Sequence, residues 1–356
     1  MSNTINTLLA LTRRGIGHRA DPICGDIDWD ELQTIADIQG LQAIVIDGVE
    51  KLPDNQRPPK PVLLQWIGEV LQGFEYRYEL YRRATAELAA FYNAHGYKMM
   101  VLKGYGCSIN WPKPEHRPCG DIDIWQFGQQ KEADSALVKE AQIKIDKSHH
   151  HHTVFNWRDF IVENHYDFIN VHHHKSNVEL EKLFKELGKD DTHFVELYGE
   201  KVYLPSPNLH ALFLLRHCMA DFASAVLILR QVLDWAFFVE KQGKSVDWDW
   251  LLKVLEQYHM TEFFNCVNAI CVEDLGFEAC IFPYVQFSPF LKDRIFKEIV
   301  SPEYSLKEPK GLLRRIVYKY RRWKAGEWKH KICYKESMWS AFWSGVWNHL
   351  LKPSSI

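Results

Sequence analysis

The stretch Val101–Trp125, VLKGYGCSINWPKPEHRPCGDIDIW, contains two acids that alternate with two isoleucines. On a strand, residues i and i+2 point to the same side, so Asp121 and Asp123 would project together while Ile122 and Ile124 enter a core. Two converging carboxylates repel each other, and a hard divalent cation such as magnesium relieves that repulsion. The stretch therefore predicts a strand that carries two carboxylate ligands for a metal ion.

The residues just before this strand are suited to binding an anion. The apolar segment Met99–Leu102 runs into Lys103 and Gly104, and Arg117 follows later. A glycine at a strand-to-helix turn lets backbone N–H groups approach a phosphate closely. A phosphate cradle beside such metal ligands is what phosphoryl or nucleotidyl transfer requires. The alternative is an edge strand with two solvated acids, since an isolated Asp-x-Asp pattern often arises by chance.

A third carboxylate is expected from a later strand. In the predicted strand Phe160–Val171, the residues Glu163, His165 and Asp167 alternate with other residues and share one face. We assign Glu163 as the third acid and keep Asp167 in reserve. The alternative is a half-exposed strand with a polar outer face.

The combination of L-K-G, a tyrosine and R-x-x-G-D-I-D-I resembles the uncharacterised nucleotidyltransferase family of the DNA polymerase β-like superfamily. Val162–Tyr166, VENHY, is similar to the family's valine–Glu–x–His–aromatic motif. The resemblance implies an α+β fold, in which a small mixed-sheet nucleotidyltransferase core is flanked by N-terminal and C-terminal helical regions. Two features depart from the superfamily pattern. Sixteen residues separate Gly104 from Asp121, and Tyr105 stands where a serine usually follows the glycine.

The resemblance also implies an activity and a set of site residues. The activity is Mg²⁺-dependent transfer (Mn²⁺ possible) of a nucleoside monophosphate from a nucleoside triphosphate to an acceptor hydroxyl, with release of pyrophosphate. The catalytic and metal-binding residues would be Asp121, Asp123 and Glu163. The nucleotide-binding residues would be Lys103, Gly104, Ser108, Arg117, Gly120 and His165. The acceptor could be a small molecule, an RNA or a protein, and the sequence does not select the nucleotide.

The overall composition is that of an ordinary globular protein. Apolar residues make up 46% of the chain and charged residues 25%, and the net charge of −3 argues against nucleic-acid binding by the chain as a whole. The eight cysteines include no C-x-x-C pair, which is typical of free thiols in a reducing compartment. The first residues lack the layout of a signal peptide, and no apolar segment suggests a membrane span. We therefore expect a cytoplasmic protein.

Helical and strand-like patterns divide the chain into three parts. We expect an N-terminal helical region over 1–95, the α/β core over 96–204 and a C-terminal helical domain over 205–356. Apolar spacing predicts one long helix from about Val62 to Ala94, and another over Leu209–Glu240 that breaks near residues 223–224.

Two pairs of charged residues in the second long helix are four positions apart. These are His217 with Asp221 and Arg230 with Asp234. Side chains at this spacing are neighbours on a helix, so each pair can interact. Both pairs are open to two interpretations, as structural ion pairs or as contacts to a substrate.

Two histidine runs, His149–His152 and His172–His174, flank the strand that carries Glu163. Consecutive residues of an extended chain point to opposite sides, so at most two of the four imidazoles in the first run could easily share one ion. The role of these runs is left open, and a metal site and a contact to substrate phosphates are two options for it. A metal-dependent phosphohydrolase built on these runs is a further alternative, which the absence of the usual His-Asp spacing disfavours.

A basic segment lies near the C-terminus. From Lys307 to Lys331 there are ten Lys or Arg residues and two acids, and Gly311–Trp323 has the pattern of an amphipathic helix. One interpretation is a solvated helix that docks on an acidic domain. The other is a catalytically silent binding protein with the nucleotidyltransferase fold, which would hold RNA or a partner through this helix.

Overall fold

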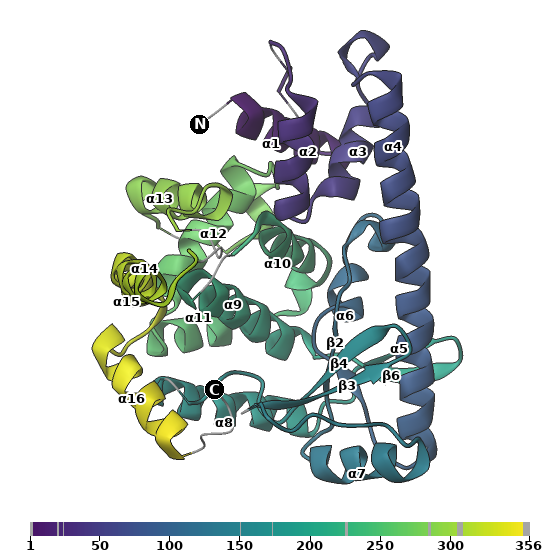
Figure 1. Ribbon diagram of the computed structural model, residues 1–356, viewed down its shortest axis with the longest axis vertical. Helices are drawn as coiled ribbons and strands as arrows, with labels where there is room; N and C mark the ends of the chain where they lie inside the picture. Colours follow the sequence, from purple (N-terminus) through teal and green to yellow (C-terminus); the bar gives the residue numbers. More distant parts are fainter. Residues whose placement is uncertain are drawn as a thin grey trace.

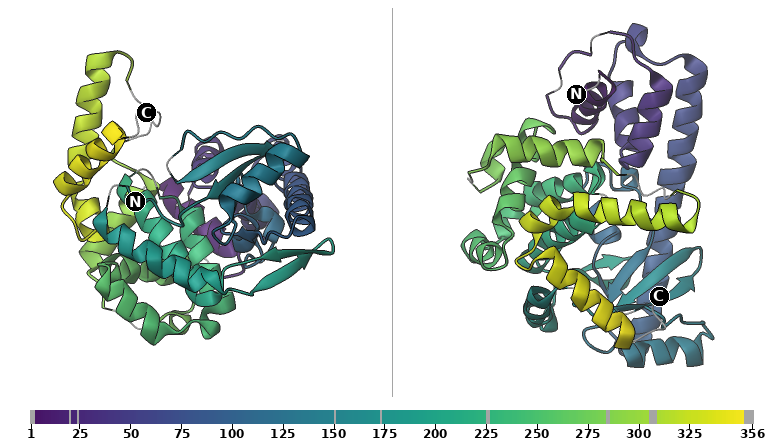
Figure 2. Two further views of the ribbon diagram at one scale, coloured as in Figure 1. Left: turned by 90° about the horizontal axis from the view of Figure 1, so that it is seen from below. Right: turned by 60° about the vertical axis from the view of Figure 1, so that its left-hand side comes forward.

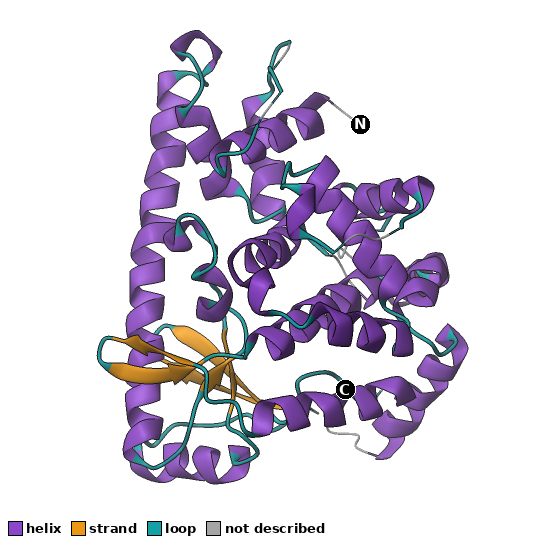
Figure 3. Cartoon of the chain, turned by 180° about the vertical axis from the view of Figure 1, so that it is seen from behind, coloured by secondary structure: helices purple, strands orange, loops and turns teal. Residues whose placement is uncertain are grey.

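A computed structural model of the chain describes residues 3–351 except 20, 24, 150, 173, 225–226, 284–285 and 305–308. Most of these residues are helical, and the strands form a single sheet, which is seen from behind in Figure 3. The architecture confirms the expected α+β class, with a small mixed sheet flanked by helices from both ends of the chain (Figure 1). The boundaries of the three expected domains stay a prediction.

The sheet has six strands in the order β3-β4-β2-β1-β6-β5. Central β1 pairs antiparallel with β2 and parallel with β6, and β4 pairs parallel with β2. Two antiparallel hairpins, β3–β4 and β5–β6, form the two edges. The strands are β1 (Met100–Val101), β2 (Ile122–Trp125), β3 (His152–Trp157), β4 (Phe160–His165), β5 (Phe194–Leu197) and β6 (Glu200–Tyr203).

The register between β2 and β4 fixes which side chains meet. Asp123 lies opposite Glu163, and Ile122 lies opposite Val162. Because side chains alternate along a strand, the two acids share one face and the two apolar residues share the other. Ile122 and Val162 are fully buried on that second face.

The N-terminal helices are α1 (Asn3–Gly15), α2 (Trp29–Ile38), α3 (Gln42–Glu50), α4 (Lys60–Val70) and α5 (Arg77–Ala94). The π-helical segment Leu71–Tyr76 joins the last two, so the expected long helix over Val62–Ala94 is present with a wider turn in its middle. Apolar periodicity did not indicate this π segment. The joined helix runs along one side of the molecule in Figure 1.

One hydrophobic cluster lies between α5 and the sheet. Tyr81, Leu88 and Tyr92 of α5 pack in the same cluster as Ile122 and Ile124 of β2. The helix α7 (Gln130–Glu140) adds its apolar residues to this layer. The aromatic residues of the long helix therefore serve the core of the sheet.

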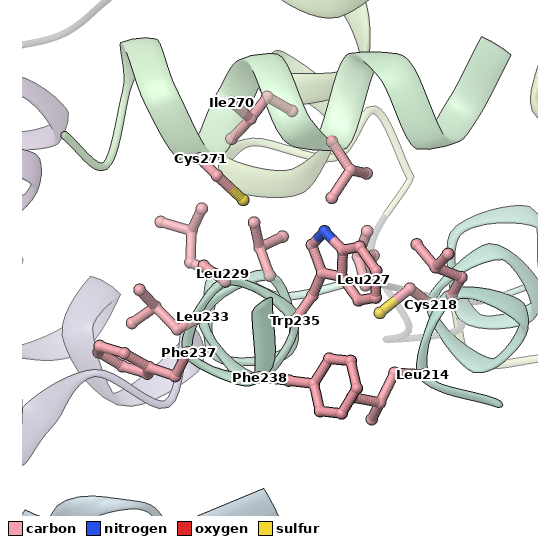
Figure 4. Packing of buried hydrophobic residues seen from close by; sticks show 14 of the residues in the cluster. Leu214, Cys218, Leu227, Leu229, Leu233, Trp235, Phe237, Phe238, Ile270 and Cys271 are labelled. Atoms are coloured by element: carbon pink, nitrogen blue, oxygen red, sulfur yellow. The ribbon is translucent and has the colours of Figure 1, made fainter. Parts of the chain in front are cut away.

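A second, larger cluster lies on the opposite face and extends into the C-terminal helices. It joins Trp125 of β2 to α8 (Lys175–Lys189), α9 (Pro207–Ser224) and α10 (Leu229–Gln242), and it also contains apolar residues of α1–α4. Figure 4 shows its centre around Trp235 of α10. The expected break near residues 223–224 is confirmed, since α9 ends at Ser224.

The remaining helices complete the C-terminal part, and the last three lie along one flank in Figure 2. They are α11 (Trp248–Gln257), α12 (Thr261–Glu273), α13 (Pro289–Val300), α14 (Leu312–Ala325), α15 (Glu327–Cys333) and α16 (Met338–Leu351). Among the described residues, none of the helices combines the length and apolarity needed to cross a bilayer. The seven described cysteines are free thiols, as expected.

One predicted strand is shorter than expected. β4 ends at His165, whereas the alternation in the sequence suggested a strand to Val171. Asp167 therefore lies beyond the sheet, where it forms an ion pair with Lys185 of α8. Two backbone N–H groups in this segment bind the Glu181 side chain instead of a neighbouring strand.

The helix α8 and the hairpin β5–β6 were not predicted from the sequence.

A buried histidine ties the N-terminal helices to the segment before β2. His116 contacts Asp47 through Nδ1 at 2.7 Å and Glu75 through Nε2 at 3.1 Å. Burial disfavours its charge, but the bonds to Asp47 and Glu75 outweigh this effect and raise the pKa of His116 above its usual value. The stabilisation is therefore complete below the usual histidine pKa and is lost as pH rises through the higher pKa of the folded state.

We predict that His116→Gln lowers the free energy of unfolding more at pH 6 than at pH 8.5. The expected loss at pH 6 is about 1–3 kcal/mol, the typical cost of removing a hydrogen bond between buried charged groups. Urea unfolding of both proteins at the two pH values measures it. An equal loss at both pH values would contradict the assigned charge on His116.

Candidate functional site

The turn after β1 requires a glycine. Gly104 adopts φ 54° and ψ −109°, in the left-handed half of backbone space that side chains disfavour. A Cβ at this position would lie 2.0 Å from the Tyr81 hydroxyl. That hydroxyl donates a hydrogen bond of 3.1 Å to the backbone carbonyl of Asp121. Tyr81 thus connects the glycine turn to the start of the acidic strand.

Asp123 is the centre of a compact charged cluster. Its carboxylate is 2.7 Å from the Lys103 ammonium and 3.2 Å from Nε2 of His165. The same Nε2 lies 3.4 Å from the Glu163 carboxylate. Burial opposes ionisation, yet the charges of Lys103 and His165 hold the pKa of Asp123 well below its usual range. Asp123 is therefore an ionised and buried carboxylate.

The three predicted acids are close enough to interact electrostatically. Burial and the neighbouring charges of Asp123 and Glu163 raise the pKa of Asp121. One ligand atom each from Asp123, Glu163 and His165 lie within 4.8 Å of one another, close enough to share one ion. Carboxylate oxygens suit a divalent cation, so the donor set fits the metal that the sequence implied. Asp121 stands beside this group, just before β2 begins.

A pocket of about 190 Å³ opens between the glycine turn, the acidic strand and helices α9 and α10. Lys103, Asp121 and Asp123 line one side of it. His217 and Arg230 line the helical side, and Gly120 also lines the pocket, as the sequence suggested. The pocket therefore brings two basic side chains, Lys103 and Arg230, into the space next to the acids.

Both expected helical pairs are formed. His217 lies 3.3 Å from Asp221, and Arg230 lies 3.5 Å from Asp234. His217 and Arg230 also line the pocket, so a contact with a substrate stays a prediction for these two residues. Arg230 is absent from the nucleotide-binding residues inferred from the sequence motifs, because its place beside the glycine turn depends on how α10 packs.

Arg117 lies in the pocket wall, but its guanidinium is bound elsewhere. It makes two bonds with Asp234, at 2.7 and 2.9 Å, and both residues are buried. Trp111 donates a further bond of 2.9 Å to the same carboxylate. The arrangement makes Arg117 a structural partner of α10, and the contact with phosphate that the sequence suggested stays a prediction.

Ser108 is also placed differently from the sequence-based expectation. Its side chain is fully buried, its hydroxyl lies 2.8 Å from that of Tyr78, and it donates to the carbonyl of Tyr105 at 2.9 Å. Ser108 ends the short helix α6 (Tyr105–Ser108) and is not among the residues that line the pocket, so its contact with a nucleotide stays a prediction. The hydroxyl instead holds this helix against α5.

The first histidine run reaches the acidic cluster. His152 begins β3 and lies across from His165, with its Nε2 3.9 Å from Glu163. Burial lowers the pKa of His151 to about 3 and that of His152 to about 4, so both rings are neutral at pH 7. In the second run, His174 stacks on Tyr334, which directly follows α15. His150 and His173 lie outside the described residues.

The basic helix α14 is largely solvent-exposed. Its predicted apolar stripe is exposed as well, with 75% of Leu312, 56% of Ile316 and 54% of Tyr320 accessible. No residue of this helix is buried. The expected docking of α14 on an acidic domain is therefore not seen in the described part of the chain.

We predict that Asp234→Ala destabilises the protein by about 3–5 kcal/mol, because it leaves the buried Arg117 charge without its partner. Thermal or urea unfolding measures the loss. The matched change Asp221→Ala affects a half-exposed carboxylate of α9 and should cost less. Equal stabilities of the two variants would show that the Arg117–Asp234 pair does not stabilise the packing of α10 on the segment before β2.

Comparisons with known proteins give one match. Neither a search of curated proteins nor a search of solved structures found a match for this chain. A protein-family model described as an uncharacterised nucleotidyltransferase matches residues 25–276, which include the whole sheet and the helices α9 and α10. The chain therefore belongs to this uncharacterised nucleotidyltransferase family.

Proposed function

We propose that this protein transfers a nucleoside monophosphate from a nucleoside triphosphate to an acceptor hydroxyl. The observation that carries the proposal is the parallel register of β2 and β4, which sets Asp123 directly opposite Glu163 on one face of the sheet. Asp121 and Lys103 adjoin that pair. Family membership supports the same class of reaction.

The acidic cluster would hold the metal. Asp123 and Glu163 supply carboxylate oxygens at short range, and Asp121 faces the same pocket. Mg²⁺, with Mn²⁺ as a substitute, would polarise the α-phosphate and lower the pKa of the acceptor hydroxyl when bound. The low pKa of Asp123 keeps it ionised and ready to bind a cation.

The basic residues of the pocket would bind the triphosphate. Lys103 reaches in from the glycine turn, and Arg230 reaches in from α10. The pocket volume of about 190 Å³ is small compared with typical ligand sites, so it would hold the phosphates while the nucleoside extends outside. These two cations would stabilise the charge that develops on the leaving pyrophosphate.

The acceptor would react at the edge near β4. Its oxygen would attack the α-phosphorus, the bond from that phosphorus to the bridging oxygen of the β-phosphate would break, and pyrophosphate would leave. Glu163 would accept the proton from the hydroxyl, because its carboxylate is partly exposed and next to the pocket acids. Hydrogen bonding from His165 lowers the pKa of Glu163 and keeps it in the basic form.

We predict that Asp123→Asn and Asp121→Asn both abolish labelling of any acceptor, or of the protein itself, by α-³²P-labelled nucleoside triphosphates with Mg²⁺. The change removes a metal ligand but keeps the shape of the side chain. Loss of one metal ligand should reduce the rate at least about a hundredfold. Each of the four nucleotides is tested with candidate sugars, RNA ends and proteins as acceptors.

The matched control is Asp159→Asn, which makes the same chemical change in the exposed turn between β3 and β4. This variant should label as well as the wild type. Because Asp123 also pairs with Lys103, a loss of labelling in Asp123→Asn can also result from unfolding. The folded state is therefore established for Asp121→Asn, by circular dichroism and thermal unfolding. Wild-type labelling by a folded Asp121→Asn protein would rule out the proposed role of that residue.

A further inference from the structure

Three imidazoles meet beside the acidic cluster. His152 of β3 is the cross-strand partner of His165 of β4, and His151 directly precedes β3. One ring nitrogen from each of the three lies within 4.8 Å of the other two. The backbone holds this group in place, since the N–H of Tyr166 donates to the carbonyl of His151 at 2.8 Å.

Two of these rings have an unsatisfied nitrogen. Only 7% of His152 and 6% of His165 is exposed, and Nδ1 of each ring has no hydrogen-bond partner among the described residues. A buried polar atom without a partner costs free energy, and such atoms usually mark a missing ligand or water. A cation bound by either of these Nδ1 atoms would remove the cost for that ring.

The opposite edges of the same rings face carboxylates. Nε2 of His165 lies 3.2 Å from Asp123, and Nε2 of His152 lies 3.9 Å from Glu163. Histidines that bind metals commonly donate their second ring N–H to a carboxylate, which fixes the tautomer and makes the metal-binding nitrogen more basic. Nε2 of His165 lies within hydrogen-bond distance of Asp123, and Nε2 of His152 lies slightly farther from Glu163.

The donor atoms indicate the class of ion. Imidazole nitrogen binds zinc, iron, nickel and copper, while magnesium prefers oxygen. Three imidazoles are also sufficient protein ligands for a zinc ion that keeps an open coordination position. This group therefore differs in chemistry from the carboxylates next to it.

We propose that His151, His152 and His165 form a binding site for a transition-metal ion of the zinc class, which adjoins the carboxylate site and shares His165 with it. The proposal does not depend on nucleotidyl transfer, because it follows from the imidazoles alone. It assigns to the first histidine run the metal role that the sequence left open.

The test uses untagged full-length protein, because a polyhistidine tag would itself bind zinc. The protein is stripped with a chelator, kept in excess Mg²⁺ without nucleotide, and titrated with Zn²⁺ by calorimetry. We expect one zinc ion per chain. Removal of a metal ligand in His151→Gln or His152→Gln should weaken zinc binding at least about tenfold. Co²⁺ should give visible absorption bands in the wild type that both variants lose.

His95→Gln is the control, since His95 is an exposed histidine at the end of α5 and should leave zinc binding unchanged. His149 is unsuitable because its ring stacks on His152. Thermal unfolding without metal establishes that each variant is folded. Zinc affinity that is unchanged in both folded variants, or no zinc binding in excess Mg²⁺, overturns the site. Zinc binding without any nucleotide transfer would count only against the proposed activity.

Discussion

The parallel pairing of β2 with β4 forces negative charges together, and the surrounding structure compensates for that repulsion. Asp123 and Glu163 face each other across this pair, with Asp121 beside them. Lys103 and His165 supply the compensating positive charge from the glycine turn and from β4 itself. Carboxylates that repel in a buried place are costly to keep unless they bind something. The cation-dependent function proposed above would offset this cost.

The helices contribute the other half of the pocket. A buried network joins Arg117 and Trp111, from the segment between β1 and β2, to Asp234 of α10. That network orients α10 so that Arg230 lines the pocket opposite Lys103. Arg117 is thus bound within this network, whereas Arg230, which also pairs with Asp234, lines the pocket. The basic helix α14 lies outside this arrangement, with its apolar and basic side chains both accessible.

Local sequence patterns predicted the parts of the site that depend on strand alternation. The spacing of Asp121 and Asp123, and the place of Glu163 on a second strand, follow from a period of two. The alternation of residues along a strand does not predict contacts between segments that are distant in the sequence. Arg117 and Asp234 are 117 residues apart, and β4 ends early because Glu181 of α8 binds the N–H groups of Phe168 and Ile169. The meeting of His152 with His165 likewise depends on the register of a hairpin.

A crystal structure of the protein with Mg²⁺ and a non-hydrolysable nucleoside triphosphate analogue would show whether the acidic cluster holds an ion that carries the triphosphate. We expect an ion held by Asp123 and Glu163 near Asp121, with the triphosphate extending between Lys103 and Arg230. An analogue bound away from the pocket, or phosphates bound there without an ion on these carboxylates, would contradict it.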